Sequence, residues 1–282
     1  MRTKIITLFI ALVAFAAQSQ IQTPQPSPGA EIEQVIGLTE VEVEYSRPAM
    51  RGRTIFGDLV PYGKVWRTGA NKRTSFSTST DITVQGKQLK EGTYALFTIP
   101  NADSWEVIFY TDAEGNGAPR ELDESKVALR VEAKPENTGY DMENFTIAFA
   151  DLADGSTGTM YLMWEKTRVG LKIGTPAKEM AMKSIEEVMA GPEPTANDYF
   201  SAAGFYHKNG MDMDKALEWS SKAAEMNPNA YWMSRQKSLI QADMGDKKGA
   251  IETAKASLAA AEKAGNMDYV KMNKESIAEW SK

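Results

Sequence analysis

Arginines, aromatic residues and glycines are concentrated in one segment of the chain, residues 45–75. This segment holds seven basic residues and one acidic residue, a net charge of +6, whereas the whole chain of 282 residues has a net charge of −6. An arginine donates paired hydrogen bonds to carboxylate, sulfate or phosphate, and an aromatic neighbour supplies an apolar wall. The segment therefore predicts a site for an anionic or carbohydrate ligand, with these candidate residues: Arg47, Arg53, Tyr62, Trp66, Arg67 and Asn71.

The same residues also allow a structural interpretation. Trp66 would fill the core, Gly69 would permit a turn, and Asn71 would satisfy backbone groups in the loop. Arg47 and Arg67 would then pair across strands with acidic residues, for which the candidates are Glu42, Glu44 and Glu165. In a purely structural protein there would be no pocket near Trp66, and every arginine would be paired.

Residue counts exclude several kinds of catalytic site. The chain has no cysteine and a single histidine, His207, so neither a three-histidine nor a Cys/His zinc site can be built. The glycine-rich phosphate loops and the nucleophile elbow are absent as motifs. An enzyme acting on envelope sugars or peptides remains an alternative that needs two carboxylates beside Trp66, with Asp58 and either Glu91 or Asp81 as candidates. We favour a protein that is not an enzyme and predict no cofactor.

One acidic loop imitates the spacing of a calcium-binding EF-hand. Oxygen-bearing side chains stand at its first, third, fifth and twelfth positions, which are Asp112, Glu114, Asn116 and Asp123. A strand precedes the loop, however, and Pro119 stands where an aliphatic residue is normally found. We therefore expect an exposed hairpin loop, with calcium binding as the alternative.

The first residues are typical of an export signal. Arg2 and Lys4 precede an apolar run from Ile5 to Ala17, and Ala17-Gln18-Ser19 offers a cleavage site. The run is too short to span a bilayer, and no later stretch is long enough. These features predict an exported protein, periplasmic or secreted, without a transmembrane segment. Its net negative charge argues against nucleic acid as a partner.

The rest of the chain changes pattern once, near residue 176. Residues 20–35, with three prolines, predict an extended linker. Residues 36–175 alternate apolar and polar residues in short runs, which predicts an antiparallel β-sandwich, with Met160–Glu165 and the run ending at Ile173 as separate strands.

Residues 176–282 are helical and carry a weak repeat. Gly210 and Gly245 are 35 residues apart, and Ala216 and Ala250 are 34 residues apart. Small residues at this spacing resemble a tetratricopeptide repeat, and residues 266–282 resemble its terminal helix. We expect a multidomain α+β protein comprising a signal peptide (1–19), a linker (20–35), a β-sandwich domain (36–175) and a tetratricopeptide-like domain (176–282) that docks a protein partner.

Long motifs in the β-half carry a more specific resemblance. Arg53–Gly57, Val65–Asn71, Glu91–Pro100 and Trp164–Val169 resemble a family known as "domain of unknown function 2911". Its members are typically exported bacterial proteins, mostly of the Bacteroidetes type, and several carry a C-terminal helical repeat. The resemblance implies no catalytic residue, because none is established for the family. Lys72 departs from the family pattern, which commonly has an acidic residue after Gly-Ala-Asn.

Overall fold

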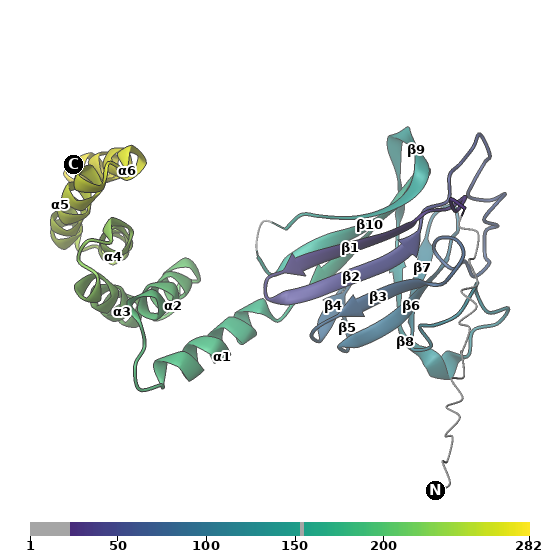
Figure 1. The fold of residues 1–282 in the computed structure, drawn as a ribbon, viewed down its shortest axis with the longest axis horizontal. Coiled ribbons are helices and arrows are strands. Elements are labelled where there is room, and N and C mark those ends of the chain that lie inside the picture. The colour runs from purple at the N-terminus through teal and green to yellow at the C-terminus, as the bar shows by residue number, and fades with distance from the viewer. Residues whose placement is uncertain (1–22, 153–154) are drawn as a thin grey trace, which may run out of the picture. The chain divides into compact units, whose positions relative to one another are not determined.

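The computed structural model describes residues 23–152 and 155–282, so the predicted signal peptide lies outside the described residues. The chain divides into two compact units between Thr175 and Pro176, and each unit is described by itself (Figure 1). Strands make up the first unit and helices the second. No helix among the described residues has the length and apolar character needed to cross a bilayer.

The first unit contains two antiparallel sheets, which confirms the predicted β-sandwich. The six-stranded sheet has the spatial order β1 (Gly29–Ile36), β2 (Thr39–Ser46), β3 (Thr74–Thr78), β6 (Gly92–Ile99), β7 (Trp105–Tyr110) and β8 (Val127–Ala133). The four-stranded sheet has the order β5 (Lys87–Leu89), β4 (Ile82–Val84), β10 (Thr157–Gly174) and β9 (Pro135–Ala150). A short 3-10 helix, Glu124–Lys126, precedes β8.

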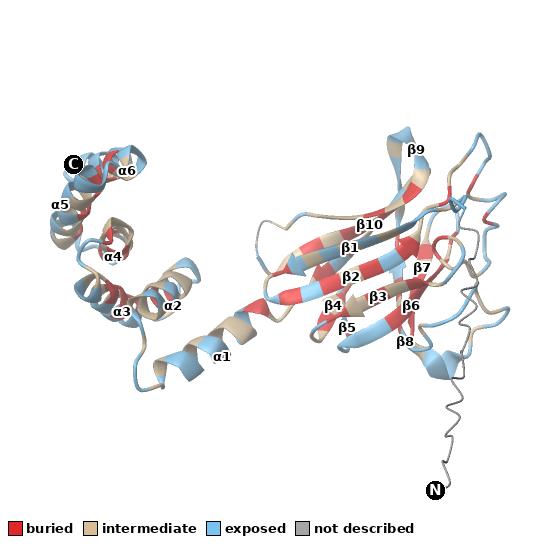
Figure 2. Cartoon of the chain, viewed as in Figure 1, coloured by how far each residue is buried: buried red, intermediate tan, exposed pale blue. Residues whose placement is uncertain are grey.

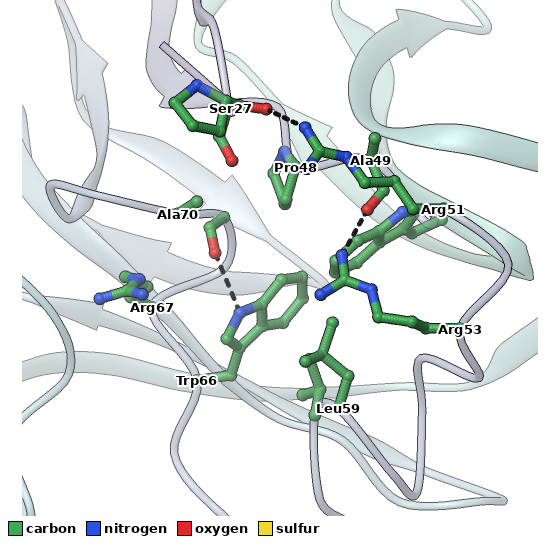
Figure 3. Close-up of a pocket in the computed structure, with 13 residues that line it drawn as sticks. Ser27, Pro48, Ala49, Arg51, Arg53, Leu59, Trp66, Arg67 and Ala70 are labelled. Carbon is green, nitrogen blue, oxygen red and sulfur yellow. Dashed lines mark hydrogen bonds between the residues drawn. The ribbon is translucent and has the colours of Figure 1, made fainter.

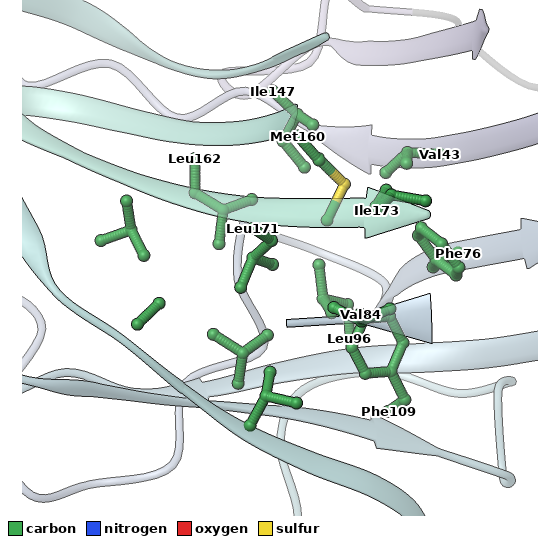
Figure 4. Packing of buried hydrophobic residues seen from close by; sticks show 14 of the residues in the cluster. Val43, Phe76, Val84, Leu96, Phe109, Ile147, Met160, Leu162, Leu171 and Ile173 are labelled. Carbon is green, nitrogen blue, oxygen red and sulfur yellow. The ribbon is translucent and has the colours of Figure 1, made fainter. Parts of the chain in front are cut away.

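The core of the first unit lies between the two sheets. Val43, Phe76 and Phe109 of the larger sheet pack against Met160 and Leu171 of the smaller one (Figure 4). Because successive side chains of a strand point to opposite faces, the alternation in β2 buries Val41 and Val43 and leaves glutamates outside (Figure 2). Without a cysteine in the chain, burial of this kind must supply the stability of the unit.

The strand predictions need three corrections. Residues 29–35 were predicted as linker but form, together with Ile36, strand β1, which pairs along its whole length with β2. The two strands predicted between Met160 and Ile173 are one continuous strand, β10, interrupted by irregular pairing around Glu165. Strands β3, β5 and β8 had no prediction of their own.

The second unit consists of six helices: α1 (Ala177–Met189), α2 (Ala196–Lys208), α3 (Met213–Met226), α4 (Tyr231–Asp243), α5 (Lys247–Ala264) and α6 (Met267–Trp280). Side-chain caps start most of them, and Thr195 and Asp198 form a reciprocal capping box at α2. The predicted terminal helix corresponds to α6. Pro176 precedes α1 as its N-cap residue.

Helices of the second unit pack as successive pairs, α2 with α3 and α4 with α5, which confirms the tetratricopeptide-like fold. Small residues stand where the helices approach most closely, and Ala203, Ala216, Ala250 and Ala254 are all completely buried. The glycines of the repeat, by contrast, lie in the turns after α2 and α4 with positive φ angles. The single histidine, His207, joins α2 to α4, since its Nε2 lies 2.6 Å from Oδ2 of Asp243.

Candidate functional site

Residues 47–73, between β2 and β3, carry the site. This connection is long and lacks regular secondary structure, and such loops within compact domains are usually functional. It is held to both sheets, because Trp66 bridges to Thr98 of β6 and Ala49 bridges to Asn144 of β9. Ile55 and Val60 bury their side chains in the main core. The basic loop, as we call residues 47–73, is therefore packed against the sandwich.

Trp66 of the basic loop lies at the centre of an aromatic cluster. Its ring stacks on Trp164 at a centroid distance of 5.9 Å and meets Phe145 edge-on at 5.1 Å. Its Nε1 donates a hydrogen bond to the carbonyl of Gly69, at 3.1 Å. These contacts hold the indole as firmly as that of a core residue. Trp66 nevertheless also lines a cavity.

The turn that follows Trp66 has an unusual backbone. Thr68 is completely buried and has a φ of 54°, a value that β-branched residues rarely adopt. Gly69 has a φ of 153°, and a Cβ there would lie 3.0 Å from the carbonyl oxygen of Ser46. Asn71 has a φ of 58°. Strain of this kind persists only where surrounding contacts hold it, and it gathers at binding sites.

Two neighbouring cavities open beside Trp66. The first, of about 340 Å³, is lined by residues of the basic loop together with Pro26, Ser27 and Trp164 (Figure 3). The second, of about 240 Å³, lies next to it and is lined by Leu59, Val60, Pro61, Lys64, Val65, Trp66, Arg67 and Ala118. Leu59, Val60, Trp66 and Arg67 contribute to both cavities.

Three arginines line the first cavity: Arg51, Arg53 and Arg67. Among the described residues, no carboxylate oxygen lies within 4.0 Å of a guanidinium nitrogen of any of them. Arg53 donates to the carbonyls of Met50 and Ala49, at 3.0 and 2.7 Å, and Arg51 donates to the carbonyl of Pro26, at 3.2 Å. None of the three arginines is therefore paired with a carboxylate, although Arg51 and Arg53 are exposed to solvent.

Arg67 is the least satisfied of the three. Its Nε is buried and has no hydrogen-bond partner among the described residues. A buried donor without an acceptor costs about 1–3 kcal/mol, more when it is charged.

The cross-strand ion pairs proposed for the structural interpretation are absent from the described residues. The guanidinium of Arg47 instead donates to the carbonyl of Phe145 at 3.1 Å and to Oγ1 of Thr146 at 2.7 Å. Neither Arg47 nor Arg67 pairs with the glutamates named for them. The two conditions of a purely structural protein, no pocket beside Trp66 and every arginine paired, are thus both unmet.

The six predicted site residues divide into two groups. Arg53, Trp66 and Arg67 line the first cavity, whereas Arg47, Tyr62 and Asn71 do not. Asn71 uses its amide to donate to the carbonyl of Ser27 and to Oγ of Ser46, at 3.1 and 3.3 Å. Tyr62 is 45% exposed, and its ring covers Gly57.

Sequence reasoning missed Arg51, Leu59 and Trp164 at this cavity. Arg51 belongs to the basic segment of residues 45–75, so its positive charge could have identified it as a candidate site residue. Trp164 belongs to the Trp164–Val169 motif in β10, 98 residues after Trp66. Only the fold brings the two tryptophans together.

The four residues at calcium-like spacing are not brought together as a metal site. Among the described residues, no group of three side chains from His, Asp or Glu could hold a metal ion. Asp112 lies 3.4 Å from Arg73 and 3.5 Å from Lys126, and the hydrogen bond from Arg73 lowers the pKa of its carboxyl. Asp123 caps the 3-10 helix by accepting from Ser125, which lowers its pKa.

The carboxylates suggested for an enzyme do not line these cavities. Asp81 accepts from Lys90 at 2.6 Å and from the backbone N–H of Glu91 at 3.0 Å, and the bond to Lys90 lowers its pKa. Neither Asp81, Glu91 nor Asp58 is among the described residues that line the two cavities beside Trp66. The cavities therefore bring cations and apolar groups together, without paired carboxylates.

Comparison with known proteins gives one family and one fold. The family described as "Protein of unknown function (DUF2911)" matches residues 27–173. No curated protein matches the chain. A solved complex of the TPR2B domain of yeast Sti1 with pHsp70 is similar to 37% of this chain and 80% of its own length, at 19% identity and a TM-score of 0.32.

Proposed function

The chain belongs to the DUF2911 family of proteins of unknown function, and from that premise we propose that it is a non-catalytic binding protein. Its β-domain takes an anionic ligand at the cavity beside Trp66. Its helical domain docks a protein partner. The family itself supplies no activity, so the proposal rests on the chemistry of this chain.

The grouping of Arg51, Arg53 and Arg67 at one cavity, without a carboxylate partner, carries the proposal. These three line one cavity; Arg51 and Arg53 donate to backbone carbonyls, and Nε of Arg67 has no partner among the described residues. A bound carboxylate, sulfate or phosphate would accept charge-assisted hydrogen bonds, which are about twice as strong as neutral ones. The strained, glycine-dependent turn after Trp66 supports the same conclusion.

Thermal unfolding against a panel of anions tests the proposal. The panel contains acetate, phosphate, sulfate, uronic oligosaccharides and neutral oligosaccharides of equal length. A ligand at a hundredfold its Kd adds about 2.7 kcal/mol to the free energy of unfolding, so an anion that binds should raise Tm measurably. Arg67→Gln should abolish the shift, whereas Arg168→Gln, which makes the same charge change on β10, should retain it.

Two results of this experiment count against an anion site. Equal shifts with neutral and acidic sugars would show that charge is not what the cavity recognises. A large loss of stability in Arg67→Gln, without any anion binding by the parent protein, would assign the arginine a structural role.

Protein docking is the function that the helical domain supports. Stacked helix pairs commonly present a surface to a partner. Three methionines at the helix ends, Met226, Met244 and Met267, are exposed, and methionine adapts its shape to varied partners. A photo-crosslinker at position 244 should capture a defined partner in cell extracts. The same crosslinker at exposed Leu38 of the β-domain should not, and equal capture from both positions would argue against docking by the helices.

Export is part of the proposal, on the strength of the predicted signal. The mature protein would then begin at Gln20, in the periplasm or outside the cell. Fractionation of cells and mass spectrometry of the N-terminus test this. A full-length chain in the cytoplasm would contradict it.

A further inference from the structure

We propose that the ligand of the β-domain is an amphipathic anion, a carboxylate carried on an aliphatic body, with its head at Arg67 and its body in the second cavity. This inference rests on the proposed anion site and names the class of ligand. The inference rests on the side chains that line the second cavity and on the packed layer behind them. It also rests on the scarcity of hydroxyl and amide side chains in both cavities.

Six of the eight residues that line the second cavity have apolar side chains. Leu59, Val60, Pro61, Val65, Trp66 and Ala118 line it, and Lys64 and Arg67 are its two charged residues. Binding sites for small molecules usually combine mainly apolar walls with a few placed polar groups. Leu59 is 43% exposed, an apolar side chain held partly in solvent at the boundary of the two cavities.

The walls of this cavity rest on a packed layer. Val65 and Ala118 pack against a small cluster on β6 and β7, formed by Ala95, Phe97, Ile108 and Tyr110, all of which are buried. Trp66 is fixed from below by Trp164 and Phe145. An apolar body that enters the cavity therefore meets a surface that is already formed, which lowers the entropic cost of binding.

Arg67 connects the charged part of the site to the apolar part. It lines both cavities, and its Nη1 lies 3.4 Å from the place of a Cβ on Gly117, so the guanidinium passes close to the loop that carries Ala118. Its Nε has no acceptor among the described residues, and no ion pair holds its guanidinium. A carboxylate at Arg67 would leave its aliphatic chain directed along Leu59 and Val65.

The lining offers few side-chain acceptors for the hydroxyl groups of a sugar. The two cavities together offer one hydroxyl side chain, Ser27, and no amide or carboxylate side chain among the described residues that line them. A sugar ring buries several hydroxyl groups, and each loses hydration unless it finds a partner. A methylene chain has no such requirement.

Isothermal titration of the full chain with straight-chain carboxylates tests the inference. The probes are acetate, butyrate, hexanoate and octanoate below their micelle concentrations, with hexanol as the uncharged counterpart. Each methylene that enters the cavity should lower the Kd about threefold to fourfold, until the cavity is full. Hexanoate should therefore bind at least tenfold more tightly than acetate, and hexanol should bind more weakly than hexanoate.

Two substitutions test where the aliphatic part of the ligand binds. Leu59→Ser should remove most of the dependence on chain length, whereas Leu38→Ser, at an exposed leucine of the β1–β2 turn, should leave it unchanged. Ala118→Leu, which fills the second cavity from its other wall, should weaken hexanoate more than acetate. Circular dichroism of each variant confirms that it folds.

The outcomes separate this inference from the proposed function. Affinity that is independent of chain length, or a dependence that Leu59→Ser and Leu38→Ser change equally, would overturn the amphipathic ligand while leaving an anion site. Tight binding of uronic oligosaccharides without binding of hexanoate would do the same. Binding of no anion of any kind would overturn both.

Discussion

Trp66 of the basic loop and Trp164 of β10 stack with their ring planes 20° apart, and this pair ties the floor of the cavity to the sandwich core. Trp164 is almost completely buried, and its Nε1 donates to the carbonyl of Glu143 at 3.2 Å. Glu143 in turn receives the backbone N–H of Arg51 on its carboxylate, at 2.9 Å. One tryptophan thus supports both the aromatic floor and the segment that carries an arginine.

Trp164→Ala should therefore destabilise the β-domain strongly. Removal of a buried tryptophan costs about 3–5 kcal/mol, because the apolar contacts are lost and a cavity remains. Denaturant unfolding followed by circular dichroism measures the change. Tyr140→Ala, at a tyrosine of β9 that is 58% exposed, should change stability by less than about 0.5 kcal/mol. Equal effects of the two substitutions would show that the tryptophan pair is not part of the core.

Gly69→Ala should test the requirement for glycine in the turn after Trp66. A Cβ at this position would lie 3.0 Å from both the carbonyl oxygen of Ser46 and Oγ1 of Thr74, and the φ of 153° is itself unfavourable for alanine. We expect a loss of about 2–4 kcal/mol. Gly86→Ala, in the β4–β5 turn, also has a positive φ but meets no atom within 4 Å, so it should cost only about 1 kcal/mol. A smaller loss for Gly69→Ala than for Gly86→Ala would contradict the close approach.

How much of this site the sequence predicts depends on how far apart its parts lie in the chain. The charge, the aromatic residues and the turn glycine of the basic loop are neighbours in sequence, and they indicated the segment that lines both cavities. The contact of Trp66 with Trp164 depends on the pairing of β10 within the second sheet, which no local pattern encodes. The same reason explains why Arg47 was expected in the cavity: its hydrogen bonds to β9 are set by the fold.

Strand predictions succeeded where alternation was strong and failed where other signals were stronger. In β2 the valines alternate with glutamates, and the valines are buried on one face of the strand. The two-residue period of the sequence therefore matches the burial pattern. Strand β1 follows three prolines, and the proline signal led to the prediction of a linker although Ile32 alternates with glutamates. Strand β10 continues through Glu165 with a φ of 53°, an irregularity that the sequence gives no reason to expect.

Glu42→Gln should stabilise the protein at neutral pH. Glu42 lies opposite Glu33 in the β1–β2 ladder, and burial first, followed by the charges of Glu31, Glu33, Glu40 and Glu44, raises the pKa of its carboxyl above the usual 4.5. An acid whose pKa is raised on folding weakens the folded state wherever it is ionised. The gain should be a few tenths of a kcal/mol above the raised pKa, and it should disappear as the pH falls through that pKa towards 4.5.

Urea unfolding of the Glu42 variant between pH 4 and 8 measures this dependence. Glu193→Gln makes the same charge change at an exposed position between α1 and α2, so it serves as the control. A gain of the same size from both variants would reflect net charge rather than the ladder. A gain that grows as the pH falls would contradict the raised pKa.

Ala254→Leu should separate the stability of the helical domain from that of the β-domain. Ala254 is completely buried where α5 packs, and overpacking of a tight helix contact costs about 1–3 kcal/mol. Ala256→Leu lies two residues further along the same helix, where the side chain is exposed, and should be nearly neutral. Because the two units have separate cores, thermal unfolding of Ala254→Leu should lower the transition of the helices and leave that of the sheets in place. A single transition that moves as a whole would instead show that the two domains unfold together.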